Sequence, residues 1–110
     1  MIDEILTASG INYRRARFLS PPAGTYAVYM DDVTTDGPDD LNWIRVHAVT
    51  IELYEATPDD TAEAALEAAM DQAGVRWTKQ DRYWLQDEQR YQVVYEFEFY
   101  EKGGPNNGQA

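Results

Sequence analysis

An alternation of apolar and polar side chains over residues 90–101 is the feature that most restricts how this chain can fold. Every second position is aromatic or β-branched: Tyr91, Val93, Tyr95, Phe97 and Phe99. A period of two places these side chains on one face of a β-strand, and such residues suit a half-buried, pleated surface. The stretch therefore predicts a long strand in an antiparallel sheet, whose aromatic face requires an apolar cover.

The most distinct helical pattern, over residues 57–73, can supply that cover. Thr57 can cap this helix, Pro58 suits its first position, Asp59 and Asp60 favour the positive end of its dipole, and Gly74 ends it. Its apolar positions form one stripe, made of Ala62, Ala65, Leu66, Ala69, Met70 and Ala73. The acidic row on the opposite side is expected to face solvent and consists of Glu63, Glu67 and Asp71.

The other elements are predicted from shorter patterns. They are a helix at 2–9 ended by Gly10, an extended stretch at 11–18, strands at 25–31 and 43–55, and strands at 75–79 and 81–85 that lead into a hairpin with 90–101. In the 43–55 strand the apolar positions change phase, which suggests a bulge near residue 48. The predicted fold is α+β with two layers, a mainly antiparallel sheet of four to five strands carrying two helices on one face. We expect one domain over residues 1–101 and a disordered tail over 102–110.

Residues 31–40 are rich in aspartate and are predicted to form a connecting loop available for contacts. Part of this segment matches a calcium-binding loop, at Asp32, Thr34, Asp36, Gly37 and Asp40. The position that requires a bidentate glutamate holds Trp43 instead, and Pro38 interrupts the pattern. We therefore predict no metal site.

Several function classes lack the residues that they need. The chain has no cysteine, so it has neither disulfides nor thiolate chemistry. Its single histidine, His47, has no nucleophile beside it in sequence, and no glycine-rich phosphate loop is present. No apolar run approaches the ~20 residues of a membrane span, and no signal peptide follows Met1. The expectation is a soluble protein that is not an enzyme and binds no cofactor.

The net charge is −11, with 20 acidic against 9 basic residues. An acidic surface repels nucleic acid, so binding to the phosphate backbone is not the expected main function. The charge is compatible with simple solubility, with a channel that DNA must cross without being held, or with mimicry of DNA. Three of the bases, Arg14, Arg15 and Arg17, form a basic patch that could meet an acidic partner or lie on a solvated strand edge.

Three stretches resemble the tail terminator (tail-completion, head-tail joining) proteins of long-tailed bacteriophages and prophages. These are residues 50–55 with Pro58 and Asp59, the acidic helix from Glu63 to Gln72 followed by Gly74, and residues 91–98. The N-terminal helix, the Pro21-Pro22 pair and the aspartate-rich loop also lie where that family has them. The resemblance covers nearly all of residues 2–101 and rests on structural motifs, so no catalytic residue is implied.

The resemblance implies a ring, usually a hexamer, at the head-proximal end of the tail tube. Such a ring ends tube polymerisation and joins the tail to the head-side connector, while DNA passes through its lumen without specific binding. The implied partners are other copies of the chain, the tail tube protein and the connector protein, with no membrane. The implied location is the tail-neck junction of the virion, and the host cytoplasm during assembly. A head-side connector ring, and an acidic DNA mimic that inhibits a nucleic-acid-binding protein, remain alternatives.

Candidate interface residues follow from charge and from aromatic side chains, which are enriched at interface cores. They are Arg14, Arg15, Arg17, Tyr29, Asp36, Trp43, Trp84 and Tyr100. The strand around residues 26–30 is the expected edge that a neighbouring subunit covers, because both of its faces are apolar. Trp84 and Tyr100 are expected to act as a pair that anchors the contact.

Overall fold

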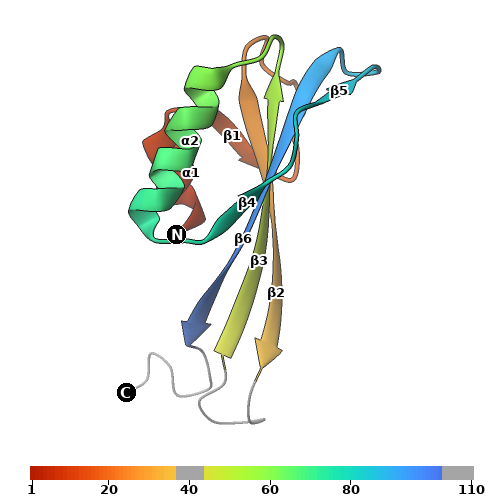
Figure 1. The fold of residues 1–110 in the computed structure, drawn as a ribbon. Coiled ribbons are helices and arrows are strands. Elements are labelled where there is room, and N and C mark those ends of the chain that lie inside the picture. The colour runs from red at the N-terminus through yellow and green to blue at the C-terminus, as the bar shows by residue number, and fades with distance from the viewer. Residues whose placement is uncertain (37–43, 103–110) are drawn as a thin grey trace.

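The computed structural model describes residues 1–36 and 44–102. Two helices and six strands follow one another in the order α1 (Ile2–Ser9), β1 (Asn12–Arg15), β2 (Tyr26–Asp36), β3 (Ile44–Glu55), α2 (Asp60–Ala73), β4 (Trp77–Lys79), β5 (Tyr83–Leu85) and β6 (Arg90–Lys102). Both helices lie on one side of the sheet, so the predicted two-layer α+β architecture is confirmed (Figure 1).

The sheet has the strand order β1-β2-β3-β6-β4, and β5 also pairs with β6. β1 runs parallel to β2, whereas the other pairs are antiparallel. The sheet therefore holds six strands rather than the predicted four to five, and it is mainly antiparallel, as predicted, with one parallel pair. β6 lies between β3 and the short strands β4 and β5, and its predicted hairpin with β5 is confirmed.

The core lies between the helices and the odd-numbered face of the long strands. Val93, Tyr95 and Phe97 of β6 are buried there, so the predicted aromatic face is confirmed. Leu66 and Met70 of α2 are fully buried against this layer, together with Ile5 and Leu6 of α1, Ala27 of β2 and Ile51 and Leu53 of β3. Both helices end at glycines in the left-handed conformation, Gly10 at φ 75° and Gly74 at φ 77°.

α2 begins later than predicted and is rotated about its axis. Its N-cap is Asp59, whose carboxylate accepts a hydrogen bond from the Ala62 amide at 3.0 Å, so Thr57 is not the cap. The buried positions are Glu63, Leu66, Ala69 and Met70, while Ala62 and Ala65 are half-buried. The prediction that the acidic row faces solvent is wrong for Glu63, which is buried because Lys79 and Arg82 from the segment after α2 lie against it, whereas Glu67 is half-buried and Asp71 is exposed.

β2, β3 and β6 run well past the end of the helical layer (Figure 1). We call this three-stranded extension the arm; it comprises residues 31–36, 44–48 and 98–102. The predicted loop at residues 31–40 is therefore strand as far as Asp36, and β6 continues through Lys102, one residue past the predicted domain boundary. Residues 37–43 and 103–110, with Trp43, the rest of the aspartate-rich loop and the predicted disordered tail, lie outside the described residues.

β3 contains no bulge at residue 48. Its register with β2 and with β6 is continuous from Ile44 to Glu55. The apolar positions change phase because the cover changes: Val49, Ile51 and Leu53 face the helices, whereas Ile44, Val46 and Ala48 lie on the opposite face, in the arm. The phase change therefore marks the place where the helical layer stops.

We predict that Leu66→Asp abolishes the folded state. Leu66 is fully buried, and an unpaired buried charge costs several kcal/mol, comparable with the ~5–15 kcal/mol that stabilises a whole domain. Thermal melting by circular dichroism should show no cooperative transition, while the control Ala68→Asp, on the exposed side of the same helix, should melt nearly as the wild type. Ala65→Glu should be milder than Leu66→Asp, because Ala65 is only half-buried. An unchanged melting temperature for Leu66→Asp would contradict the placement of α2.

Candidate functional site

Open strand edges are the main feature of the described surface that an interaction could use. β1 pairs with residues 26–29 of β2, and beyond this point no described strand pairs with the outer side of β2. On the other side of the sheet, β4 pairs with β6 only as far as Phe97, so within the described residues the outer side of residues 98–102 is also unpaired. Unpaired edges of this kind are templates for another chain.

The arm also carries apolar side chains that are exposed to solvent. Tyr100 is 67% exposed, Val33 47% and Ile44 43%, and they lie on adjacent strands. Tyr100 lies opposite Val46, on the face of the sheet that has no helices, whereas Val33 belongs to the other face. Both faces of the arm thus present apolar surface that a partner could cover.

His47 links the three strands of the arm. Its Nδ1 lies 2.9 Å from a carboxylate oxygen of Asp31 on β2, and its Nε2 lies 2.9 Å from Glu101 on β6. Its ring stacks on Phe99, with centroids 4.3 Å apart. These contacts give His47 a structural role in the arm.

The charge on His47 depends on these two carboxylates. Burial opposes the charged form, but the hydrogen bonds to Glu101 and Asp31 outweigh it, so the pKa of His47 is raised above 6.5. A raised pKa means that the contribution of the charged ring to stability is fully present below 6.5 and is lost as the pH rises through the raised value. The charged ring can donate from both nitrogens, one to Asp31 and one to Glu101.

The basic patch lies at the opposite side of the sheet from the arm end of β6. Arg14 and Arg15 are on β1 and Arg17 follows in the next loop, and all three are exposed. Arg14 donates to the carbonyl of Tyr13 at 2.9 Å, and its guanidinium lies 5.2 Å from the centre of the Phe18 ring. No ion pair joins any of the three to an acid within residues 1–36 and 44–102.

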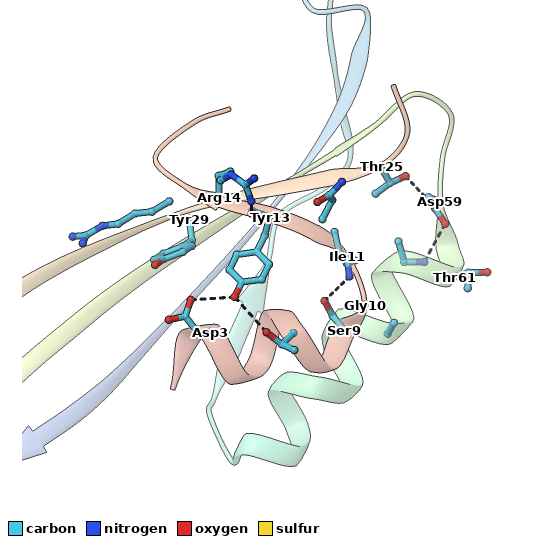
Figure 2. Close-up of a pocket in the computed structure, with 15 residues that line it drawn as sticks. Asp3, Ser9, Gly10, Ile11, Tyr13, Arg14, Thr25, Tyr29, Asp59 and Thr61 are labelled. Atoms are coloured by element: carbon cyan, nitrogen blue, oxygen red, sulfur yellow. Dashed lines mark hydrogen bonds between the residues drawn. The ribbon is translucent and has the colours of Figure 1, made fainter. Parts of the chain in front are cut away.

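A groove of about 920 Å³ lies between β1, α1 and the start of α2 (Figure 2). Its polar groups bind one another: the Tyr13 hydroxyl donates to Asp3 at 3.2 Å, and Thr25 donates to Asp59 at 2.6 Å. Ser9 accepts from the Ile11 amide at 3.2 Å. These hydrogen bonds fasten β1 and the segment after it to the two helices. The polar groups are thus already paired with one another rather than directed toward a ligand.

A second cluster of ionisable groups lies where the β4–β5 segment crosses α2. Arg82 contacts Glu63 at 2.7 Å and Glu55 at 3.2 Å, and Lys79 contacts Glu63 at 2.9 Å and Glu67 at 2.7 Å. Burial, followed by the neighbouring Glu63, raises the pKa of Glu55 to about 7. Hydrogen bonds to Glu55, Lys79 and Arg82 outweigh burial and lower the pKa of Glu63 to about 2.

Opposed pKa shifts in adjacent carboxylates also occur at catalytic sites. Here each acid is engaged by a cation from the chain itself, and no serine or histidine takes part in these contacts. Glu67 also accepts from the Tyr95 hydroxyl at 2.7 Å and Asp71 from the Trp77 indole at 2.8 Å. The arrangement fastens the β4–β5 segment to α2. No group of acids and histidine in the described part of the chain is arranged to hold a metal ion.

Comparison with solved structures finds the fold in a virus-like particle. The chain superposes on a chain of the "Virion of native gene transfer agent (GTA) particle". The TM-score is 0.63 at 19% identity, and the match covers 90% of this chain and 84% of that one. At this identity the two chains share a fold. No family model and no curated protein matches the sequence. In residues 1–36 and 44–102, neither helix has the length and apolar character needed to cross a bilayer.

Trp84 and Tyr100, predicted to anchor a contact together, lie far apart within one subunit, so they cannot form a single patch on it. Trp84 pairs with Tyr91 near the start of β6, and nine residues of strand, about 30 Å, separate Tyr91 from Tyr100. They also belong to opposite faces of the sheet. The two side chains are exposed at separate places on the surface, Trp84 at 41% and Tyr100 at 67%.

Other candidate positions differ from expectation as well. Tyr29 is half-buried and packs against the core, with its ring 6.4 Å from that of Tyr13, so it is not an exposed aromatic. The edge expected around residues 26–30 is already covered by β1 of the same chain over residues 26–29. Asp36 ends β2 in the arm, and Trp43 lies outside the described residues.

Sequence reasoning missed the arm and the groups that hold it together. His47, Asp31 and Glu101 are far apart in sequence, and only the strand register brings them together. The change of apolar phase within β3 was the available signal, because it marks where one cover ends. The bulge predicted from this change of phase is absent, since the strand register is continuous.

We predict that the pKa of His47 depends on Asp31. His47 is the only histidine, so its ring protons can be followed without ambiguity in a proton NMR titration. The wild-type pKa should lie above 6.5, and Asp31→Asn should lower it. Asp32→Asn, the neighbouring acid on the other face, should have a much smaller effect. Equal effects of the two substitutions would contradict the direct contact.

We also predict that Glu55→Gln becomes more stabilising as the pH rises. Since the pKa of Glu55 is raised to about 7, the stability linked to its neutral form is present below 4.5 and lost as the pH rises through about 7. Glutamine stays neutral, so the difference in melting temperature between variant and wild type should grow between pH 5 and pH 9. The exposed control Glu88→Gln, in the turn before β6, should show no such trend. A constant difference would mean that Glu55 is already ionised at pH 5.

Proposed function

We propose that this chain is a virion structural protein that forms a ring at the head-proximal end of a phage-like tail tube. In this proposal six copies close the ring, end tube polymerisation and join the tail to the head-side connector. DNA crosses the lumen without specific binding, and the protein performs no catalysis. The protein works at the tail-neck junction of the virion after assembly in the host cytoplasm.

The observation that carries the proposal is the fold, shared over 90% of the chain with a chain of a gene transfer agent virion. The arm supports it, because unpaired edges and exposed apolar side chains on a small domain need a partner. Contacts between two different surfaces of identical subunits close into rings when the rotation allows it. The net charge of −11 suits a channel that must not hold DNA.

The DNA-mimic alternative requires a row of free carboxylates spaced like phosphates. The row that suggested it, Glu63, Glu67 and Asp71, is occupied within the chain by Lys79, Arg82 and the Trp77 indole. That observation favours the structural role. A head-side connector ring shares the same supporting observations and differs in its place in the particle.

We predict a ring at one end of the tail. The wild-type protein should give closed rings by negative-stain electron microscopy and masses of six copies by native mass spectrometry, most abundantly when mixed with tail tubes. Cryo-electron microscopy of assembled particles should place the chain at the head-proximal end of the tube, with acidic residues lining the lumen.

The same measurement separates the alternatives. Density on the head side of the junction would favour the connector ring. A protein that stays monomeric or dimeric, is absent from particles and competes with DNA for a basic protein would support the mimic. A lumen lined mainly by basic residues would contradict the proposed passage of DNA.

A further inference from the structure

The two free strand edges lie on opposite sides of the same sheet. Within residues 1–36 and 44–102, β1 is the last strand on the β2 side, and residues 98–102 of β6 form an unpaired edge on the other side of the arm. Edges on opposite sides allow a head-to-tail contact, in which one edge of each subunit meets the other edge of the next. Contacts of this kind are heterologous, and they build a ring when the rotation between subunits closes.

The charges on these two edges are complementary. Arg14 and Arg15 lie on β1, whereas Glu98 and Glu101 lie on the free end of β6. The register places Arg14 on the same face of the sheet as Glu98, and Arg15 on the same face as Glu101. If one sheet continued into the next across a subunit boundary, Arg14 could lie opposite Glu98 on the face without helices.

The competing edge does not have this property. No strand of the described part of the chain pairs with the outer side of residues 30–36 of β2 either, but this edge carries Asp31 and Asp32. Like charges opposite each other in paired strands are destabilising. Against Glu98 and Glu101 this edge would therefore be repelled, whereas the β1 edge would be attracted.

Tyr100 adds an apolar element to the same contact. It lies between Glu98 and Glu101 in sequence, is 67% exposed and shares its face of the sheet with Arg14. An aromatic ring beside an arginine can bury its surface and bind the cation through its face. The edge of β6 thus offers hydrogen-bonding groups, charge and an aromatic side chain in one short segment.

We propose that residues 98–102 of one copy of this chain add as a strand to the outer edge of β1 in the next copy. Arg14 then faces Glu98 across the boundary, and Tyr100 lies on the same face two residues further along. This inference rests on the proposed ring and names the contact that closes it. The partner of the basic patch is accordingly a second copy of the chain.

Charge reversal tests the contact. Arg14→Glu and Glu98→Arg should each weaken self-association about tenfold or more, measured by sedimentation velocity. An equimolar mixture of the two variants should restore it, because in an alternating ring each boundary again joins opposite charges. The control Asp87→Arg, in the exposed turn before β6, should associate as the wild type does. Failure of both the mixture and the Arg14→Glu/Glu98→Arg double variant to recover would overturn the proposal.

Cysteine trapping detects the contact even when it is brief. The chain has no cysteine, so Arg14→Cys/Glu98→Cys should give a ladder of cross-linked species on oxidation or with a short bis-maleimide, whereas each single variant should stop at dimers. A wild-type ring without a ladder would refute this contact and leave the proposed function standing. A cross-linked ladder from a protein that is absent from the tail end would support this contact and refute the proposed function. Absence of both ring and ladder would overturn both.

Discussion

The aromatic face of β6 must be covered, and the two helices cover only its first part. Val93, Tyr95 and Phe97 are buried under α1 and α2, whereas Phe99 is half-buried and Tyr100, on the other face, is largely exposed. β3 follows β6 beyond the helices because their backbones pair throughout, and β2 follows because it pairs with β3 in the same way. The length of the strands relative to the helices therefore divides the molecule into a packed body and an arm.

The arm is held by polar contacts where apolar cover is missing. His47 joins Asp31 and Glu101 across three strands and stacks on Phe99. In the body, Arg82 and Lys79 form ion pairs that fasten the β4–β5 segment to the acidic side of α2. The chain has only nine basic residues against twenty acidic ones, so each cation that pairs with a buried or half-buried acid offsets a charge that few other residues could neutralise. The exposed Arg14, Arg15 and Arg17 are notable because the described acids leave them unpaired.

The elements were largely predictable, because local patterns determine them. The period of two in β6, the glycines that end both helices and the hairpin between β5 and β6 all depend on residues close in sequence. The faces of α2 were less predictable. Glu63 is buried because Arg82 and Lys79, 19 and 16 positions further along, reach it, and an isolated helical pattern contains no information on such partners.

The sequence by itself determined the fold class, the aromatic core face and the acidic character, since these follow from periodicity and composition. Only the tertiary structure decided that residues 31–36 are strand, that β1 occupies the edge of β2, and that Trp84 and Tyr100 lie about 30 Å apart. The physical reason is that strand pairing joins residues from distant parts of the chain. Which edges stay open, and which charges they carry, depends on that pairing and on where the helical cover ends.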